Sequence, residues 1–239
     1  MMSDWKPKRF WKTVAVVEND GEWAIQLDGR EVKTPAKAPL RLKSKRLAHA
    51  VAEEWEAQIE KVDPNTMPVT RSANSAIDKL SVQRKEVVEL LAAYGETDLL
   101  CYRAASPQEL VERQASEWGP IIDWAQQSYG IRLAVGVGVM HVPQPKETIA
   151  TLSKTMDQMD DFALAAFHDL VCISGSLLLA LAVAHRRISA EQAWNASRVD
   201  ESWQEEQWGV DEEAADLAMR KNADFLKAAE IYFLANSSA

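Results

Sequence analysis

The residue types best suited to chemistry or to recognition concentrate in one acidic segment near the end of the chain. The segment Asp200–Asp216 contains eight acidic residues, no Lys or Arg, and two Trp, Trp203 and Trp208. A carboxylate pair such as Glu205 and Glu206 can perform acid–base catalysis only in a cleft that separates the two pKa values. Acids of a single sign beside Trp are also typical of a protein-binding surface, because such charge steers a partner and Trp is enriched at binding hot spots.

The same segment also has a purely structural interpretation. Within one helix, Glu201 and Glu205 would share a face, where like charges destabilise the helix by about 0.2–0.5 kcal/mol. The acids Asp211–Glu213 favour the start of a further helix, because carboxylates there complement the helix dipole. Trp194 and Trp208 are then interpreted as core residues, since Trp is highly buried on average.

Other reactive residues form no recognisable catalytic pattern. His168 precedes Asp169 in a strongly apolar stretch, which favours a core histidine over a metal ligand or base. Cys101 has no adjacent base, Ser174–Ser176 lacks the frame of a nucleophile elbow, and Gly136–His141 lacks the third glycine of a dinucleotide loop. The sequence therefore predicts no enzyme, no metal and no cofactor. The alternative is a small-molecule enzyme that uses a carboxylate pair near Glu201–Glu206, with His168.

Composition and charge exclude several classes of protein. The net charge of −9 argues against a general nucleic-acid binder. The longest apolar run, Leu170–Ala184, is shorter than the roughly 20 residues that a membrane-spanning helix needs, so no membrane insertion is expected. The two cysteines, Cys101 and Cys172, form no closely spaced pair, which favours a reducing compartment. The N-terminus carries no apolar secretory signal.

The elements that position these residues change type along the chain. Turn residues at Asn19–Gly21 and at Asp28 and Gly29 predict an antiparallel β meander within residues 10–35. Ser44 is a candidate cap for a helix running to about Ile59, with an apolar face that includes Trp55. At least six helices are expected after residue 70, and we expect residues 189–207 to form one of them.

Charge follows the same division. Residues 1–50 hold eleven Lys or Arg against six Asp or Glu, which leaves the rest of the chain strongly acidic. We therefore expect an α+β fold, with a small antiparallel β-rich N-terminal domain over residues 1–70. A larger, all-helical C-terminal domain is expected over residues 71–239.

Several sequence runs, taken in order, resemble one family of chaperones. The family assists ATP synthase assembly by binding the free alpha subunit of the catalytic F-one sector, and its mitochondrial members are known as assembly factor 2. Each run is short, but their order is specific and extends from about residue 8 to residue 235. The runs are Arg9–Lys12, Leu27–Pro35, Ala52–Gln58, Pro68–Arg71, Ser72–Asp78, Thr97–Arg103, Glu117–Pro120 and Glu201–Ala214.

The resemblance implies a function without catalysis: the chaperone keeps the alpha subunit soluble until the beta subunit docks. It also implies a β-rich N-terminal domain and a helical C-terminal domain. The sequence lacks the long targeting extension of the mitochondrial members, which the resemblance places in the mitochondrial matrix, so a cytoplasmic bacterial member is expected. We also expect the protein to be a monomer. The residues that the resemblance marks for partner contact or site integrity are Trp55, Arg71, Asp98, Glu201, Trp203, Glu205, Glu206 and Trp208. For Trp55, the apolar helix face favours a core position over contact.

Overall fold

The computed structural model describes residues 8–237, which divide into two compact units. The first unit takes residues 8–84, 160–166 and 230–237, and the second takes residues 85–159 and 167–229. Helices α6, Asp161–Ser174, and α10, Glu212–Ala235, therefore contribute residues to both units. Residue 70, at the expected domain boundary, lies inside helix α2, Pro68–Ser75.

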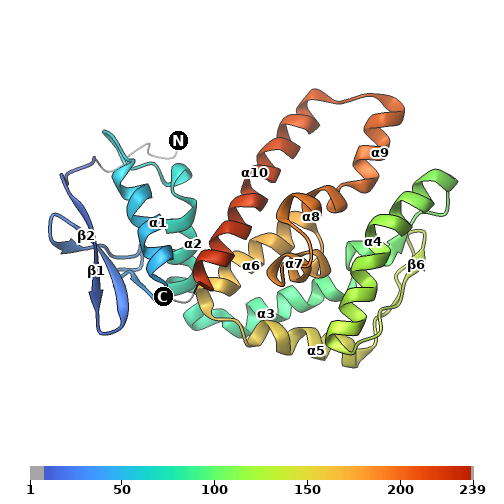
Figure 1. Ribbon diagram of the computed structural model, residues 1–239, viewed down its shortest axis with the longest axis horizontal. Coiled ribbons are helices and arrows are strands. Elements are labelled where there is room, and N and C mark those ends of the chain that lie inside the picture. Colours follow the sequence, from blue (N-terminus) through green and yellow to red (C-terminus); the bar gives the residue numbers. More distant parts are fainter. Residues whose placement is uncertain (1–7, 238–239) are drawn as a thin grey trace. The chain divides into compact units, whose positions relative to one another are not determined.

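A small antiparallel sheet forms the N-terminal part of the first unit (Figure 1). Asp20 and Gly21 adopt φ values of 54° and 80°, as a type I′ turn between two strands requires. This sheet confirms the predicted meander. Its strands all pair with β2 and are β1 (Val14–Asn19), β2 (Glu22–Leu27), β3 (Arg30–Glu31) and β4 (Arg41–Leu42).

Helix α1, Lys45–Glu56, follows the sheet and begins at the predicted cap. The Ser44 hydroxyl accepts the backbone N–H of Leu47 at 3.3 Å, which satisfies one of the unpaired donors of the first turn. Leu47 and Val51 are buried on the face toward the core. The expected extension to Ile59 is wrong, because the helix ends at Glu56 and the Ile59 side chain is 83% exposed.

The first unit continues through a 3-10 turn, η1 (Pro64–Thr66), helix α2 and a π-helical turn, η2 (Ala76–Leu80). The Glu54 carboxylate of α1 accepts the backbone N–H groups of Val69 and Thr70, each at 2.7 Å. A carboxylate at that position complements the start of α2 and links it to α1.

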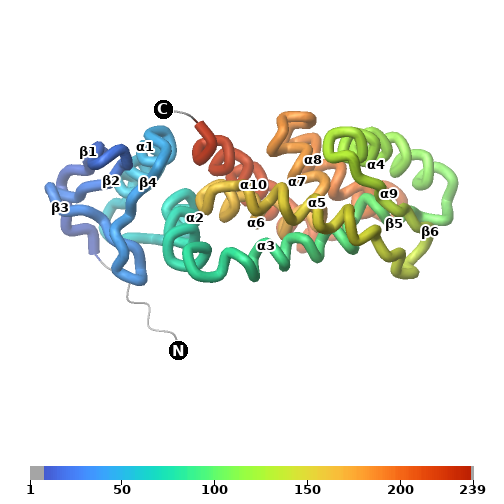
Figure 2. The backbone as a smooth tube through the Cα atoms, turned by 90° about the horizontal axis from the view of Figure 1, so that it is seen from below, coloured from blue at the N-terminus to red at the C-terminus, as the bar shows by residue number. Residues whose placement is uncertain are grey.

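Helices dominate from Ser81 onward, which confirms the α+β fold and the expected helical region (Figure 2). A short parallel pair of strands, β5 (Tyr102–Arg103) and β6 (Gly136–Val137), departs from the all-helical expectation. A 3-10 turn, η3 (Leu99–Cys101), precedes β5. The remaining helices are α3 (Ser81–Glu96), α4 (Gln108–Tyr129), α5 (Lys146–Asp157), α7 (Leu177–Ala184), α8 (Ala190–Ser197) and α9 (Val199–Trp208).

The core of the second unit surrounds α7, whose residues 177–183 are all buried. Trp118 of α4 is fully buried, and its indole N–H donates to the backbone carbonyl of Ala196 at 2.7 Å. This bond fixes the end of α8 against α4, because a buried indole N–H without a partner is costly.

Among the helices within residues 8–237, none combines the length and the apolar composition that a membrane-spanning segment needs.

The helix expected over residues 189–207 is interrupted. Arg198 has φ −120° and ψ 21°, outside the helical range, and separates α8 from α9. The break matters for the acidic segment, because it gives α9 its own start and its own direction (Figure 1).

Candidate functional site

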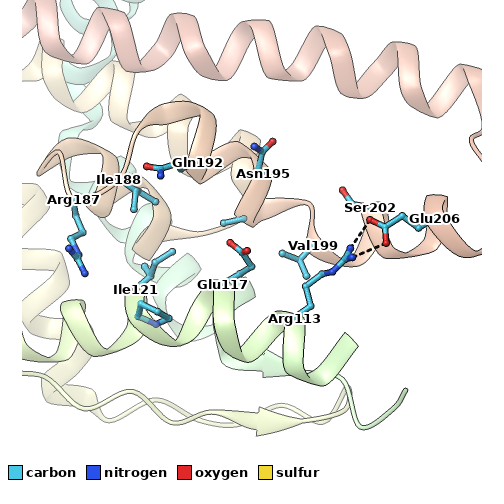
Figure 3. Close-up of a pocket in the computed structure, with 12 residues that line it drawn as sticks. Arg113, Glu117, Ile121, Arg187, Ile188, Gln192, Asn195, Val199, Ser202 and Glu206 are labelled. Carbon is cyan, nitrogen blue, oxygen red and sulfur yellow. Dashed lines mark hydrogen bonds and ion pairs between the residues drawn. The ribbon is translucent and has the colours of Figure 1, made fainter. Parts of the chain in front are cut away.

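The acidic helix α9 is attached to α4 by a pair of parallel hydrogen bonds (Figure 3). Both guanidinium nitrogens of Arg113 contact the two carboxylate oxygens of Glu206, each at 2.8 Å. The Arg113 guanidinium also lies over the ring of Trp203, 5.3 Å from its centroid. The hydrogen bond from Arg113 lowers the pKa of Glu206, so this carboxylate is ionised at neutral pH.

A second arginine, Arg198, pairs with two other acids of α9. Arg198 donates to Glu205 at 3.1 Å and approaches Glu201 at 3.8 Å. The same guanidinium lies 5.7 Å from the ring centroid of Trp194. The acids of α9 are therefore not uncompensated, as the sequence segment suggested, because their cations come from outside Asp200–Asp216.

Asp200 attaches the first turn of α9 to a buried side chain of α4. Its carboxylate accepts from the side-chain amide of Gln114 at 2.6 Å, and Gln114 is almost fully buried. The amide oxygen of the same Gln114 side chain accepts the backbone N–H of Ala104 at 2.7 Å. Asp200 therefore positions α9, and its carboxylate is occupied within the protein.

The surface between α4, α8 and α9 is concave, with a cavity volume of about 540 Å³ (Figure 3). Glu117 and Glu206 contribute carboxylates to its lining, and Arg113 and Arg187 contribute cations. A general acid at neutral pH needs a raised carboxyl pKa, whereas Arg113 shifts Glu206 in the opposite direction. This geometry suits recognition of polar or charged groups better than proton transfer.

Exposed apolar side chains lie at the end of α9, in the connection that follows it and in α10. Trp208 is 80% exposed, and Val210 and Met219 are 64% and 65% exposed. Large apolar side chains exposed beside acids are typical of a surface that meets a partner. The core alternative is therefore wrong for Trp208, whereas Trp194 is buried as expected.

The four acids that follow Gly209 include a helix cap. Asp211 accepts the backbone N–H groups of Glu213 and Ala214 at 2.9 and 3.2 Å, which confirms its structural role at the start of α10. Glu212 and Glu213 lie in the first turn of the same helix, where the dipole favours them.

The structure places Trp55 and Arg71 in the first unit and the other marked residues in the second. Trp55 is half-buried and packs edge-on against Trp11, with ring centroids 5.2 Å apart. Arg71 is exposed, and its guanidinium makes no ion pair with any residue between 8 and 237. Of the marked residues, α9 therefore brings together Glu201, Trp203, Glu205, Glu206 and Trp208, while Trp55 and Arg71 lie in the first unit.

Asp98 is fully buried in the second unit, where it cannot contact a partner. Its carboxylate accepts the Ser176 hydroxyl at 2.8 Å and the backbone N–H groups of Leu100 and Leu178, each at 3.0 Å. Burial raises the pKa of Asp98 to about 6, although these hydrogen bonds oppose the shift. Asp98 thus holds the start of α7, and any effect on the site is indirect.

Sequence reasoning missed the cations that hold α9. Arg198 lies three and seven residues before Glu201 and Glu205, a helical spacing that could have indicated it. Arg113 is 93 residues from Glu206, and no local pattern connects the two. His168 was expected in the core, but its side chain is 35% exposed. The described residues contain no cluster of His, Cys, Asp or Glu that could hold a metal ion.

Comparison with known proteins adds independent support for a chaperone. The sequence model of the family described as "ATP12 chaperone protein" matches residues 8–126. The mitochondrial protein atp12 of Schizosaccharomyces pombe is 28% identical over 225 residues, which cover 88% of this chain and 76% of that protein.

Solved structures agree over nearly the whole chain. The crystal structure of Atp12 from Paracoccus denitrificans is 45% identical, with a TM-score of 0.94 over 98% of this chain and 100% of that one. The Atu1473 protein of Agrobacterium tumefaciens, described as a putative chaperone, is 42% identical with a TM-score of 0.89, over 95% of this chain and 85% of that one. The ordered sequence runs, the fold and these similarities together establish that the chain belongs to the ATP12 chaperone family.

Proposed function

We propose that this chaperone binds the free alpha subunit of ATP synthase and assists assembly of the catalytic F-one sector. The alpha subunit is the partner that the sequence resemblance implies, and family membership supports the assembly role. The single observation that carries a binding role for α9 is Trp208, a large aromatic side chain left 80% exposed beside acidic residues.

The shape and charge of the α9 surface suit a partner rather than a small substrate. Glu201 and Glu206 present half-exposed carboxylates, with side chains each 51% exposed. Arg198 and Arg113 hold them in place, so binding needs little further ordering of these side chains. Rim charges of this kind mainly raise the association rate and give specificity.

A free alpha subunit presents a large surface that is meant for the beta subunit, and obligate interfaces are apolar enough to aggregate when uncovered. A chaperone can protect such a surface without ATP if the beta subunit later displaces it with higher affinity. Moderate affinity is therefore part of the mechanism. A polar, partly acidic interface around a Trp anchor meets that requirement.

A small-molecule enzyme acting through Glu205 and Glu206 is not favoured. Both carboxylates are paired with arginines, and the Arg113 bond lowers the pKa of Glu206. We propose a chaperone without catalysis and without a cofactor, acting as a monomer in the bacterial cytoplasm. Two observations support that compartment. The chain is similar to proteins of two bacteria, and its two cysteines form no disulfide.

The proposal is tested by mixing the purified chain with purified alpha or beta subunit and measuring complex formation by size-exclusion chromatography with light scattering. Aggregation of the alpha subunit is followed in parallel. We expect a complex with the alpha subunit, less aggregation, and release when the beta subunit is added. Equal binding to both subunits, or no effect on aggregation, would contradict the proposal.

A further inference from the structure

A cluster of reactive side chains lies on α6, away from the acidic helix, and the chaperone function does not use it. The exposed Cys172 thiol lies 3.5 Å from Nε2 of His168, one helical turn earlier. Nδ1 of the same imidazole lies 3.1 Å from a carboxylate oxygen of Asp169. From α3, Tyr94 interacts with the Cys172 thiol, and this interaction raises the pKa of the Tyr94 hydroxyl.

This arrangement has the parts of an activated thiol. The hydrogen bond to Asp169, followed by that to Cys172, raises the pKa of His168 to about 10, so its ring is a cation at neutral pH. Burial by itself raises the pKa of the Cys172 thiol, but the hydrogen bonds with His168 and Tyr94 outweigh it and the net shift is downward. A thiol beside an imidazolium loses its proton more readily, and the thiolate is the form that reacts.

We propose that Cys172 is an oxidation site that hydrogen peroxide converts to a sulfenic acid, with His168 as the activating residue. The thiolate sulfur attacks one peroxide oxygen, the O–O bond breaks, and an S–OH group forms. The departing hydroxide takes a proton from the His168 imidazolium and leaves as water. Sulfur loses two electrons and peroxide gains them, and Asp169 keeps the imidazole oriented throughout.

The second cysteine of the chain provides an internal control. Cys101 is 1% exposed, and burial, followed by the charge of Asp98, raises its pKa to about 12. It therefore stays a protonated thiol that peroxide does not reach. Oxidation that distinguishes the two cysteines in one folded molecule depends on their surroundings and not on the amount of reagent.

The expected rate effect follows from ionisation. An ordinary cysteine is only about 3% thiolate at pH 7, so full ionisation raises its reactive fraction about 30-fold. A thiolate becomes less nucleophilic as the pKa of its thiol falls, and this loss cancels about half of the gain on a logarithmic scale. The net increase in the oxidation rate at pH 7 is therefore about fivefold. Near pH 9.5 an ordinary thiol is itself mostly ionised and, because of its higher pKa, is the stronger nucleophile, so the order of the rates should reverse.

The test treats the full-length chain with hydrogen peroxide and dimedone, and mass spectrometry then locates and times the adducts. We expect the adduct at Cys172 and not at Cys101, and no adduct in Cys172→Ser. His168→Gln should react about fivefold more slowly than wild type at pH 7 and faster than wild type near pH 9.5. Tyr94→Phe, which removes one hydroxyl, should slow the reaction less than His168→Gln does. This variant provides a second test if His168→Gln does not fold.

Three results would overturn the proposal. One is a folded wild-type protein without an adduct at Cys172. Another is equal modification of Cys101 and Cys172 in that protein. The third is a His168→Gln protein that reacts at the wild-type rate at every pH.

Discussion

The buried carboxylate of Asp98 should make the stability of the protein depend on pH in a way that one substitution removes. Asp98→Asn keeps the size of the side chain but replaces one acceptor oxygen with a donor. Either Leu178 N–H or the Ser176 and Leu100 donors then lose their partner. A buried donor left without a partner costs about 1–3 kcal/mol, so the variant should be less stable by about that amount at low pH.

The pH dependence has a definite sign. Burial raises the pKa of Asp98 from 3.8 to about 6, so between these values the folded protein binds more protons than the unfolded chain. Stability from this group is therefore greatest below the unfolded value and decreases as pH rises through the folded value. A shift of this size corresponds to about 3 kcal/mol in total, most of it lost between about pH 4 and pH 6. Asp98→Asn cannot titrate and lacks this loss.

The measurement is urea unfolding of wild type and Asp98→Asn, followed by Trp fluorescence at several pH values between about 4.5 and 7.5. We expect the stability difference between the two proteins to shrink by about 2 kcal/mol across this range. Asp123→Asn, an exposed substitution on α4 of the same unit, is the matched control and should show a constant difference. A constant or growing difference for Asp98→Asn would refute the reasoning.

Two further substitutions separate stability from binding. Trp208→Ala, at a side chain that is 80% exposed, should change the free energy of unfolding by no more than about 0.5 kcal/mol yet weaken alpha-subunit capture, as titration calorimetry and thermal melts together would establish. Normal capture by this folded variant would remove Trp208 from the interface. Trp118→Phe should show the opposite pattern, because it leaves the buried carbonyl of Ala196 without its donor and should cost about 1–3 kcal/mol in urea unfolding. A fully stable Trp118→Phe protein would show that this hydrogen bond does not hold α8 to α4.

Local signals in the sequence predicted most of the fold. The turn residues at Asp20 and Gly21 and the cap at Ser44 act over a few positions, so their effects could be predicted without the rest of the chain. Tertiary packing decided the remainder. The break at Arg198 has no Pro or Gly to indicate it, and segments 160–166 and 230–237 join the first unit only through contacts distant in sequence.

The sequence drew attention to the acidic segment but did not indicate the cations that pair with its carboxylates. The acids and the exposed Trp208 are visible in the sequence, because composition alone marks the segment. Their neutralisation by Arg113 depends on α4 packing beside α9, which local spacing does not reveal. The resemblance to a family could mark Asp98 as a candidate residue but could not show that it is buried. A short sequence motif does not distinguish a residue that is needed in the core from one that contacts a partner.

Capture of the alpha subunit by a charge-reversed α9 tests the central claim most directly. Glu201→Lys changes a half-exposed carboxylate, and Glu86→Lys makes the same change at an exposed residue of α3. Binding of purified alpha subunit is measured by surface plasmon resonance at low and moderate salt, with thermal melts of each variant. The account predicts a slower association rate and weaker salt dependence for Glu201→Lys alone, with all melting temperatures preserved. Unchanged binding by folded Glu201→Lys, or equal loss in Glu86→Lys, would contradict it.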